Sequence, residues 1–164
     1  AGHDLTYQAD SGLVNGLDMP ASLYADMGGS LFTTEAVLQA LLLRQRPGRT
    51  CGKGVFHEVA LSDASAYLAL PRTWGLTVPS GDVGGAHAGY KVYACKNGRV
   101  ALAALEPHFA ARLCEAAGLD KATASHMHKR STHEAIAKFL ALQTRAQLDE
   151  LASSKDIPLH TLPR

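Results

Sequence analysis

The feature that most constrains the fold is a long run of helical periodicity between Pro20 and Arg46. Its apolar residues recur at intervals of three, four and seven: Leu23, Met27, Leu31, Val37, Leu38, Leu41 and Leu42. Pro20 suits a first helical turn, and Pro47-Gly48 follows two cations that favour a helix C-terminus. The sequence therefore predicts a helix over most of residues 21–44, whose apolar side chains, such as Met27 and Leu31, pack in a core.

Residues 55–59 are predicted to form a strand, and Ser62 and Asp63 then offer capping chemistry before a helical run to Leu70. This order of helix, strand and helix favours an α/β layer. The stretch from 71 to 89 holds two prolines and five glycines and is interpreted as a linker.

The C-terminal part begins with two short apolar runs, residues 90–95 and 99–105, on either side of Lys96-Asn97-Gly98. Asn-Gly is the favoured turn pair of a β-hairpin. Glu106-Pro107 then begins a helix to about Ala117, and further helices are predicted from Thr132 and over residues 147–151. We therefore divide the chain into part of an α/β domain (1–71), a linker (72–89) and a small α+β domain (90–164).

Composition excludes several classes of protein. Hydrophobic residues make up 46% and charged residues 19%, unlike a disordered chain, and the net charge of +1 gives no basic field for nucleic acid. No apolar stretch approaches the roughly 20 residues of a membrane span. Cys51, Cys95 and Cys114 are odd in number and form no CxxC pair, so we expect reduced thiols in the cytoplasm.

The first residues supply neither an initiator Met nor a secretory signal. We therefore expect the chain to begin inside a longer protein.

Six segments resemble, in the same order, the motifs of one enzyme family. Gly2-His3-Asp4 is followed in step by Tyr7, as in GHDxxYxAxSGxL, and Asp26 stands in Ala25-Asp26-Met27-Gly28-Gly29, which is similar to an ADxxGG motif but one residue shorter. The six segments are residues 2–13, 18–29, 44–48, 55–66, 90–98 and 100–109. On these motifs the chain resembles the family III CoA-transferases (CaiB/BaiF type), which include the α-methylacyl-CoA racemases.

The resemblance implies a fold and a set of catalytic residues. The fold is α/β: a fragment of the family III CoA-transferase fold, with part of the large α/β domain plus a small α+β domain carrying an antiparallel hairpin. His3 and Asp26 would exchange protons with opposite faces of the α-carbon of a 2-methylacyl-CoA, as an imidazole and a carboxylate can do. Glu106, the glutamate of the LEPxF segment at the junction of hairpin and helix, would support His3.

The same resemblance implies partners. The CoA thioester is itself the substrate, no metal or redox cofactor is needed, and the residues that grip CoA are not identified. In the family the small domain of one subunit completes the site of the other, which implies a homodimer, interlocked at full length, in which Glu106 could serve a partner's site. The family's N-terminal part, which supplies much of the grip on CoA, would lie before Ala1.

Two other functions stay open. In CoA-transferase members a carboxylate at the Asp26 position is a nucleophile, but the glycine run of such members is interrupted here between Gly81 and His87. Together with His3 and Glu106, this favours the racemase branch. The third alternative is a truncated, non-catalytic fragment or dimerisation module.

Other patterns favour structural interpretations. His126, His128 and His133 lie in a polar stretch that indicates a solvated loop rather than a metal site. The glycines between residues 81 and 89 match no phosphate-binding pattern and are expected to form a mobile linker. Gly28-Gly29, beside Asp26, would allow a thioester to approach closely.

Overall fold

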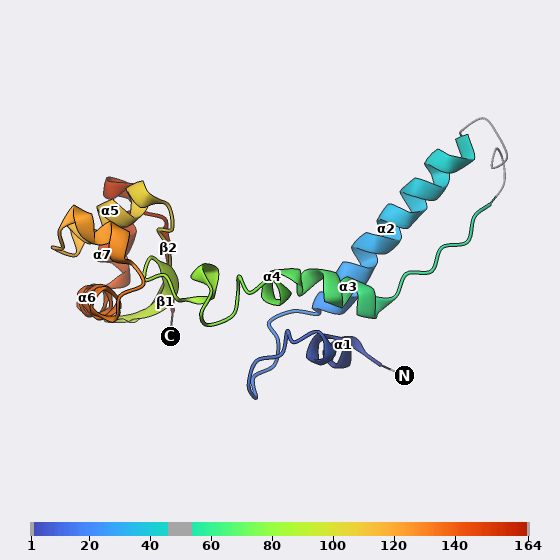
Figure 1. Cartoon of the computed structure of the whole chain (residues 1–164), viewed down its shortest axis with the longest axis horizontal. Helices are drawn as coiled ribbons and strands as arrows, with labels where there is room; N and C mark the ends of the chain where they lie inside the picture. The colour runs from blue at the N-terminus through green and yellow to red at the C-terminus, as the bar shows by residue number, and fades with distance from the viewer. Residues whose placement is uncertain (1, 46–53, 164) are drawn as a thin grey trace. The chain divides into compact units, whose positions relative to one another are not determined.

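The computed structural model describes residues 2–45 and 54–163 of the chain (Figure 1). These residues form helices and strands in two compact units, Ala1–Trp74 and Gly75–Arg164, and each unit is described by itself. None of the helices among these residues is both long enough and apolar enough to cross a membrane.

The described part of the first unit is helical. Its elements are α1 (Asp4–Asp10), α2 (Tyr24–Gln45), α3 (Leu61–Leu68) and α4 (Leu70–Thr73). The predicted long helix is confirmed as α2, although it begins at Tyr24 rather than near Ala21. The predicted stop at Pro47-Gly48 lies outside the described residues.

The N-terminal half of α2 packs against α3 through two glycines. Gly28 and Gly29 are both buried, and a Cβ on Gly29 would overlap the side chain of Leu61. A Cβ on Gly28 would lie 3.3 Å from the Cβ of Ala64. The glycines therefore allow two helices to approach closely, which corrects the interpretation that they make room for a thioester.

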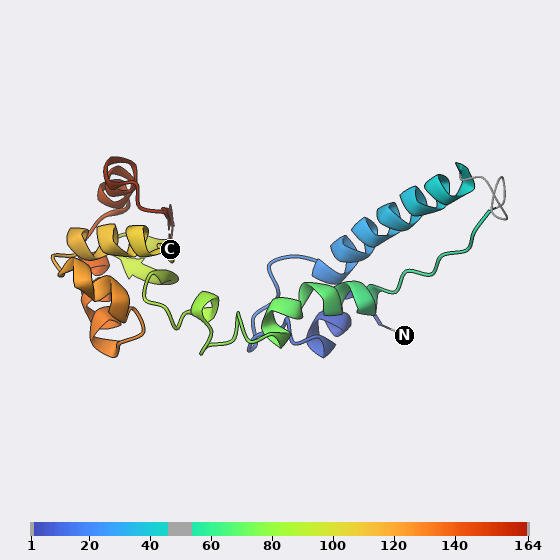
Figure 2. The ribbon, with the colours of Figure 1, turned by 45° about the horizontal axis from the view of Figure 1, so that its top comes forward.

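Much of the apolar surface of α2 is exposed. Figure 1 and Figure 2 both show α2 extending well beyond α1 and α3. Met27 is 61% exposed and Leu31 69% exposed. The prediction that these side chains pack in a core is wrong for the described part of the chain, because the small contact with α1 and α3 covers only the opposite side of the helix.

The predicted strand at residues 55–59 is also wrong. Residues 54–60 form neither helix nor strand, and Phe56 is almost fully exposed. A strand needs a neighbouring strand to receive its hydrogen bonds, and within the described residues of this unit there is none. The helical run after it is confirmed as α3, whereas α4 begins at the predicted end of that run and enters the predicted linker.

The second unit combines a small sheet with helices. Its elements are η1 (Asp82–Gly84), β1 (Tyr90–Cys95), β2 (Gly98–Ala103), α5 (Pro107–Ala116), η2 (Lys121–His126), α6 (Arg130–Ala141), α7 (Arg145–Lys155) and β3 (Leu159–Leu162). The sheet is antiparallel in the order β1-β2-β3. The predicted hairpin and the helices after it are confirmed, whereas β3 was not predicted.

The hairpin turn differs from the predicted one by one residue. Cys95 pairs with Gly98, so Lys96-Asn97 form the loop and Gly98 lies in β2. Gly98 is needed there because a Cβ would overlap the backbone oxygen of Leu162 in β3.

The core of this unit lies between one face of the sheet and helices α5, α6 and α7. Val100 of β2, Leu113 of α5, Ile136 and Leu140 of α6 and Leu148 of α7 are fully buried in it. Cys95 and Cys114 are buried free thiols, and burial raises the pKa of Cys114. Cys51 lies outside the described residues.

The segment before β1 belongs to this second unit, and its glycines are sterically required. A Cβ on Gly84 would overlap the backbone oxygen of Val78, and one on Gly89 would overlap that of Ala104. Gly84 N–H donates to the Gly81 carbonyl at 2.9 Å. These glycines thus close tight turns between backbone segments.

Two of the three histidines, His126 and His128, are exposed as predicted, and His128 pairs with Asp82 of η1 at 2.6 Å. His133 differs from the prediction, because it lies in α6 and its Nε2 donates to the carbonyl of Ala86 at 2.9 Å. No three His, Cys, Asp or Glu side chains are grouped to hold a metal ion within residues 2–45 and 54–163.

Candidate active site

The candidate site is organised around Asp4, which docks α1 on the first turn of α2. Asp4 is only 6% exposed, and its Oδ1 accepts hydrogen bonds from the backbone N–H groups of Ala25 at 2.8 Å and Asp26 at 3.0 Å. The free N–H groups at a helix start favour a carboxylate. Asp4 therefore caps α2 from outside the helix and fixes the backbone that carries Asp26.

Two further side chains hold this arrangement. Gln8 Nε2 donates to Asp4 Oδ2 and to the carbonyl of Ser22 at 3.0 Å. The Thr6 hydroxyl accepts from His3 N–H at 3.0 Å and donates to the His3 carbonyl at 2.7 Å. The backbones on both sides of the site are therefore fixed by hydrogen bonds.

His3 and Asp26 line the same pocket, which has a volume of about 290 Å³. The other lining residues come from α1 and from the segment before α2: Asp4, Leu5, Gln8, Met19, Pro20, Ser22 and Leu23. No described residue donates a hydrogen bond to the Asp26 carboxylate, which is exposed at the start of α2. Two predicted site residues that are 23 positions apart, a histidine and an aspartate whose carboxylate has no partner among the described residues, thus line one pocket.

Glu106 lies in the second unit. It is the N-cap residue of α5, its side chain is exposed, and its carbonyl accepts from Ala110 N–H at 2.9 Å. The predicted helix start after the hairpin is therefore confirmed, whereas a catalytic role of the Glu106 side chain stays a prediction.

Asp4 and Gln8 were not identified from the sequence as site residues. Both stand in the GHDxxYxAxSGxL segment, but a buried polar residue cannot be recognised from one sequence when its partners lie more than a dozen positions away. A charged residue and an amide four positions apart on one short helix were the available signal, because such residues share a helix face.

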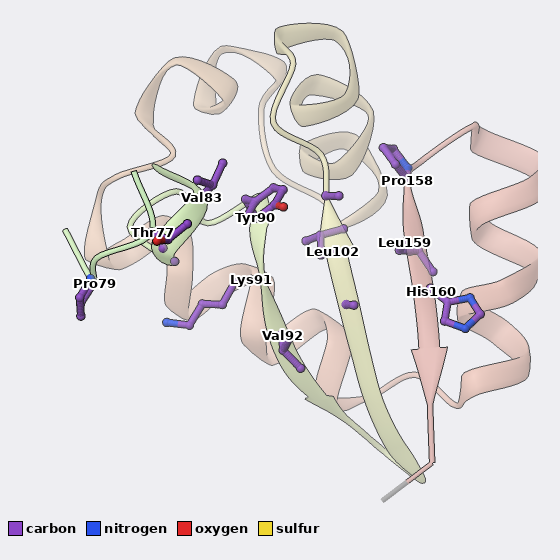
Figure 3. Close-up of a pocket in the computed structure, with 14 residues that line it drawn as sticks. Thr77, Pro79, Val83, Tyr90, Lys91, Val92, Leu102, Pro158, Leu159 and His160 are labelled. Atoms are coloured by element: carbon purple, nitrogen blue, oxygen red, sulfur yellow. The ribbon is translucent and has the colours of Figure 1, made fainter. Parts of the chain in front are cut away.

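A larger hollow of about 860 Å³ lies over the other face of the sheet in the second unit (Figure 3). Residues of all three strands line it, including Val92, Ala101 and His160 (Figure 3). Its walls are mostly apolar, and none of the three predicted catalytic residues lines it. Its titratable lining residues are Tyr90, Lys91 and His160.

The chain was compared with protein families and solved structures. The family model described as CoA-transferase family III matches residues 1–163. The chain belongs to CoA-transferase family III. The resemblance drawn from the six sequence segments is thereby confirmed.

Solved structures of this fold agree over the whole chain. A hypothetical protein, Rv3272, from Mycobacterium tuberculosis superposes with a TM-score of 0.72 and 19% identity over 97% of this chain and 47% of that one. A CaiB/BaiF family protein from Brucella suis gives a TM-score of 0.67 and 20% identity over 100% of this chain and 48% of that one. These similarities confirm the fold class, and the chain spans about half the length of the solved structures it matches.

Proposed function

We propose that the protein acts on acyl-CoA thioesters by racemase-like 1,1-proton transfer at the α-carbon of a 2-methylacyl-CoA. The observation that supports this is the shared pocket of His3 and Asp26. One group removes the α-proton, the electron pair moves to the thioester oxygen as an enolate, and the other group returns a proton to the opposite face. Hydrogen-bond donors to that oxygen would stabilise the enolate.

A second candidate is CoA transfer through Asp26, because the Asp26 carboxylate is exposed and unpaired among the described residues. The carboxylate would attack the thioester carbonyl and expel CoA thiolate, leaving an anhydride. The thiolate would then attack the aspartyl carbonyl of that anhydride, releasing the acid and leaving CoA as a thioester on Asp26. An acceptor acid would reverse the two steps.

Glu106 and the quaternary structure complete the proposal. By the family resemblance, Glu106 supports the histidine from the small domain of a partner subunit, and the protein is a homodimer that needs no metal. Because the chain covers about half of the solved chains, a non-catalytic module is the remaining alternative.

The test is deuterium incorporation at the α-carbon of 2-methylbutanoyl-CoA in D₂O. A parallel assay supplies acetate as the acceptor of CoA, and a third assay contains EDTA. We expect exchange that is insensitive to EDTA and falls roughly a hundredfold or more in His3→Ala and in Asp26→Asn. Asp10→Asn, on the exposed side of α1, is the matched control. Transfer of CoA to acetate without deuterium exchange would establish the second candidate. If neither reaction is detected, the non-catalytic module is the remaining function.

A further inference from the structure

Gln8 is the most deeply buried polar side chain of the candidate site, with 1% of its surface exposed. Its Nε2 donates to the Asp4 carboxylate and to the Ser22 carbonyl. Both donors of the amide nitrogen are therefore used by neighbours that can only accept.

The orientation of the Gln8 amide follows from these neighbours. If nitrogen and oxygen were exchanged, the amide oxygen would face the Asp4 carboxylate, which already accepts two N–H groups, and a carbonyl, and both act as acceptors. The amide atom that faces Asp4 and Ser22 is therefore the nitrogen, and the oxygen points elsewhere. Gln8 Oε1 is buried with no hydrogen-bond partner among the described residues. Buried acceptors without a partner are rare and unfavourable.

The unpaired acceptor belongs to a residue that lines the pocket with His3 and Asp26. Leu5, Met19 and Leu23 make much of the remaining wall apolar. A ligand that enters such a pocket loses the water bound to its own polar groups, so an N–H group on the ligand needs an acceptor there. Gln8 Oε1 is a buried acceptor in this wall whose hydrogen bond is not yet made.

We propose that Gln8 Oε1 accepts a hydrogen bond from the amide N–H of the cysteamine arm of a CoA thioester. This inference rests on the proposed function, because it places the thioester in the pocket of His3 and Asp26. The amide is separated from the thioester sulfur only by an ethylene group, so it is the N–H of CoA nearest to the reacting carbon. Gln8 is then a specificity residue that fixes the position of the thioester along the pocket.

The experiment compares two thioesters in the full chain: S-(2-methylbutanoyl)-N-acetylcysteamine and its isostere in which an ester oxygen replaces the amide N–H. Affinities are measured by titration while following the backbone amide signals of Ala25 and Asp26, whose N–H groups bond to Asp4. We expect wild type to prefer the N–H ligand about five- to tenfold. In Gln8→Met the preference should fall to about one, whereas Gln39→Met, on the exposed part of α2, should retain it.

Several results would overturn the proposal. Equal affinities of wild type for the two thioesters would mean that water occupies Gln8 Oε1, and this result stands even if Gln8→Met fails to fold. A preference that survives in Gln8→Met would place the acceptor elsewhere. If either thioester binds or exchanges its α-proton without this preference, only the role of Gln8 fails; if neither binds and neither exchanges, the proposed function fails with it.

Discussion

Asp4 is the residue on which the geometry of the candidate site depends most. Its carboxylate bonds to two backbone N–H groups of α2 and to the Gln8 amide. A single buried side chain thus links the segment of His3 to the segment of Asp26. Neither catalytic candidate contributes to this link with its own side chain, so the two remain available for substrate.

Replacing Asp4 should therefore disturb the site without touching a catalytic candidate. We expect Asp4→Ala to lower the stability of the first turn of α2 by about 1–3 kcal/mol, because two N–H groups and one amide lose their acceptor. Hydrogen exchange of the Ala25 and Asp26 amides measures this. Unchanged protection, or an equal effect of Asp10→Ala in the exposed part of α1, would contradict the capping role.

We expect His87 to make the stability of the second unit depend on pH. Its ring is 8% exposed, and its Nδ1 accepts from Gly89 N–H at 3.1 Å, so the ring is held in the neutral form. Burial lowers the pKa of His87, and the nearby rings of His128 and His133 lower it further, against the opposing effect of Asp82. The unfolded chain therefore binds a proton at a higher pH than the folded unit does.

The sign of the pH dependence follows from this difference. Stability should fall as pH drops below about 6.5, the usual pKa of unfolded histidine, because the unfolded state there binds more protons. His87→Asn, whose side-chain oxygen can still accept from Gly89, should flatten this slope. Thermal midpoints between pH 7.5 and 5 measure the effect, and an identical slope in the variant would assign it to other groups.

At the scale of elements, the turn around η1 depends on glycine for a steric reason. Gly84 faces the backbone carbonyl of Val78, which cannot move without breaking its bond to Gly81 N–H at 2.8 Å. We expect Gly84→Ala to lower the free energy of unfolding of the second unit by about 1–3 kcal/mol. Gly54→Ala is the control because its Cβ would meet nothing within 4 Å, and equal urea midpoints for the two variants would show that the turn adjusts.

At the scale of the whole molecule, the two units differ in what they bury. The second unit has a core of large side chains contributed by the sheet and three helices, all within its own residues. The buried residues of the first unit are small or polar, such as Ala25, Gly28 and Ser65, while Met27 and Leu31 of α2 are exposed. Burial of large apolar side chains is the dominant favourable term in folding.

We therefore expect residues 75–164, produced alone, to fold with the same amide spectrum that they have in the full chain. In the full chain, the amides of β2 and α6 should stay protected at urea concentrations that have already exposed those of α2. Residue-resolved hydrogen exchange in urea measures both. Loss of the native spectrum in the isolated unit would show that its stability depends on residues 1–74.

The sequence by itself determined the elements whose signals are local. The periodicity of α2, the turn residues around Asn97 in the hairpin and Glu106-Pro107 before α5 are all local signals of this kind. The order of six motifs was also sufficient for the family and its fold, which the match over residues 1–163 confirms.

Only the tertiary structure decided the features that depend on distant partners. The strand predicted at residues 55–59 lacked a neighbour, whereas β3 formed because β2 offered its free edge. The pocket of His3 and Asp26 exists because Asp4 reaches the first turn of α2 across about 20 intervening residues. The spacing of residues along a chain does not specify such hydrogen bonds, because they form only when packing brings the two segments together.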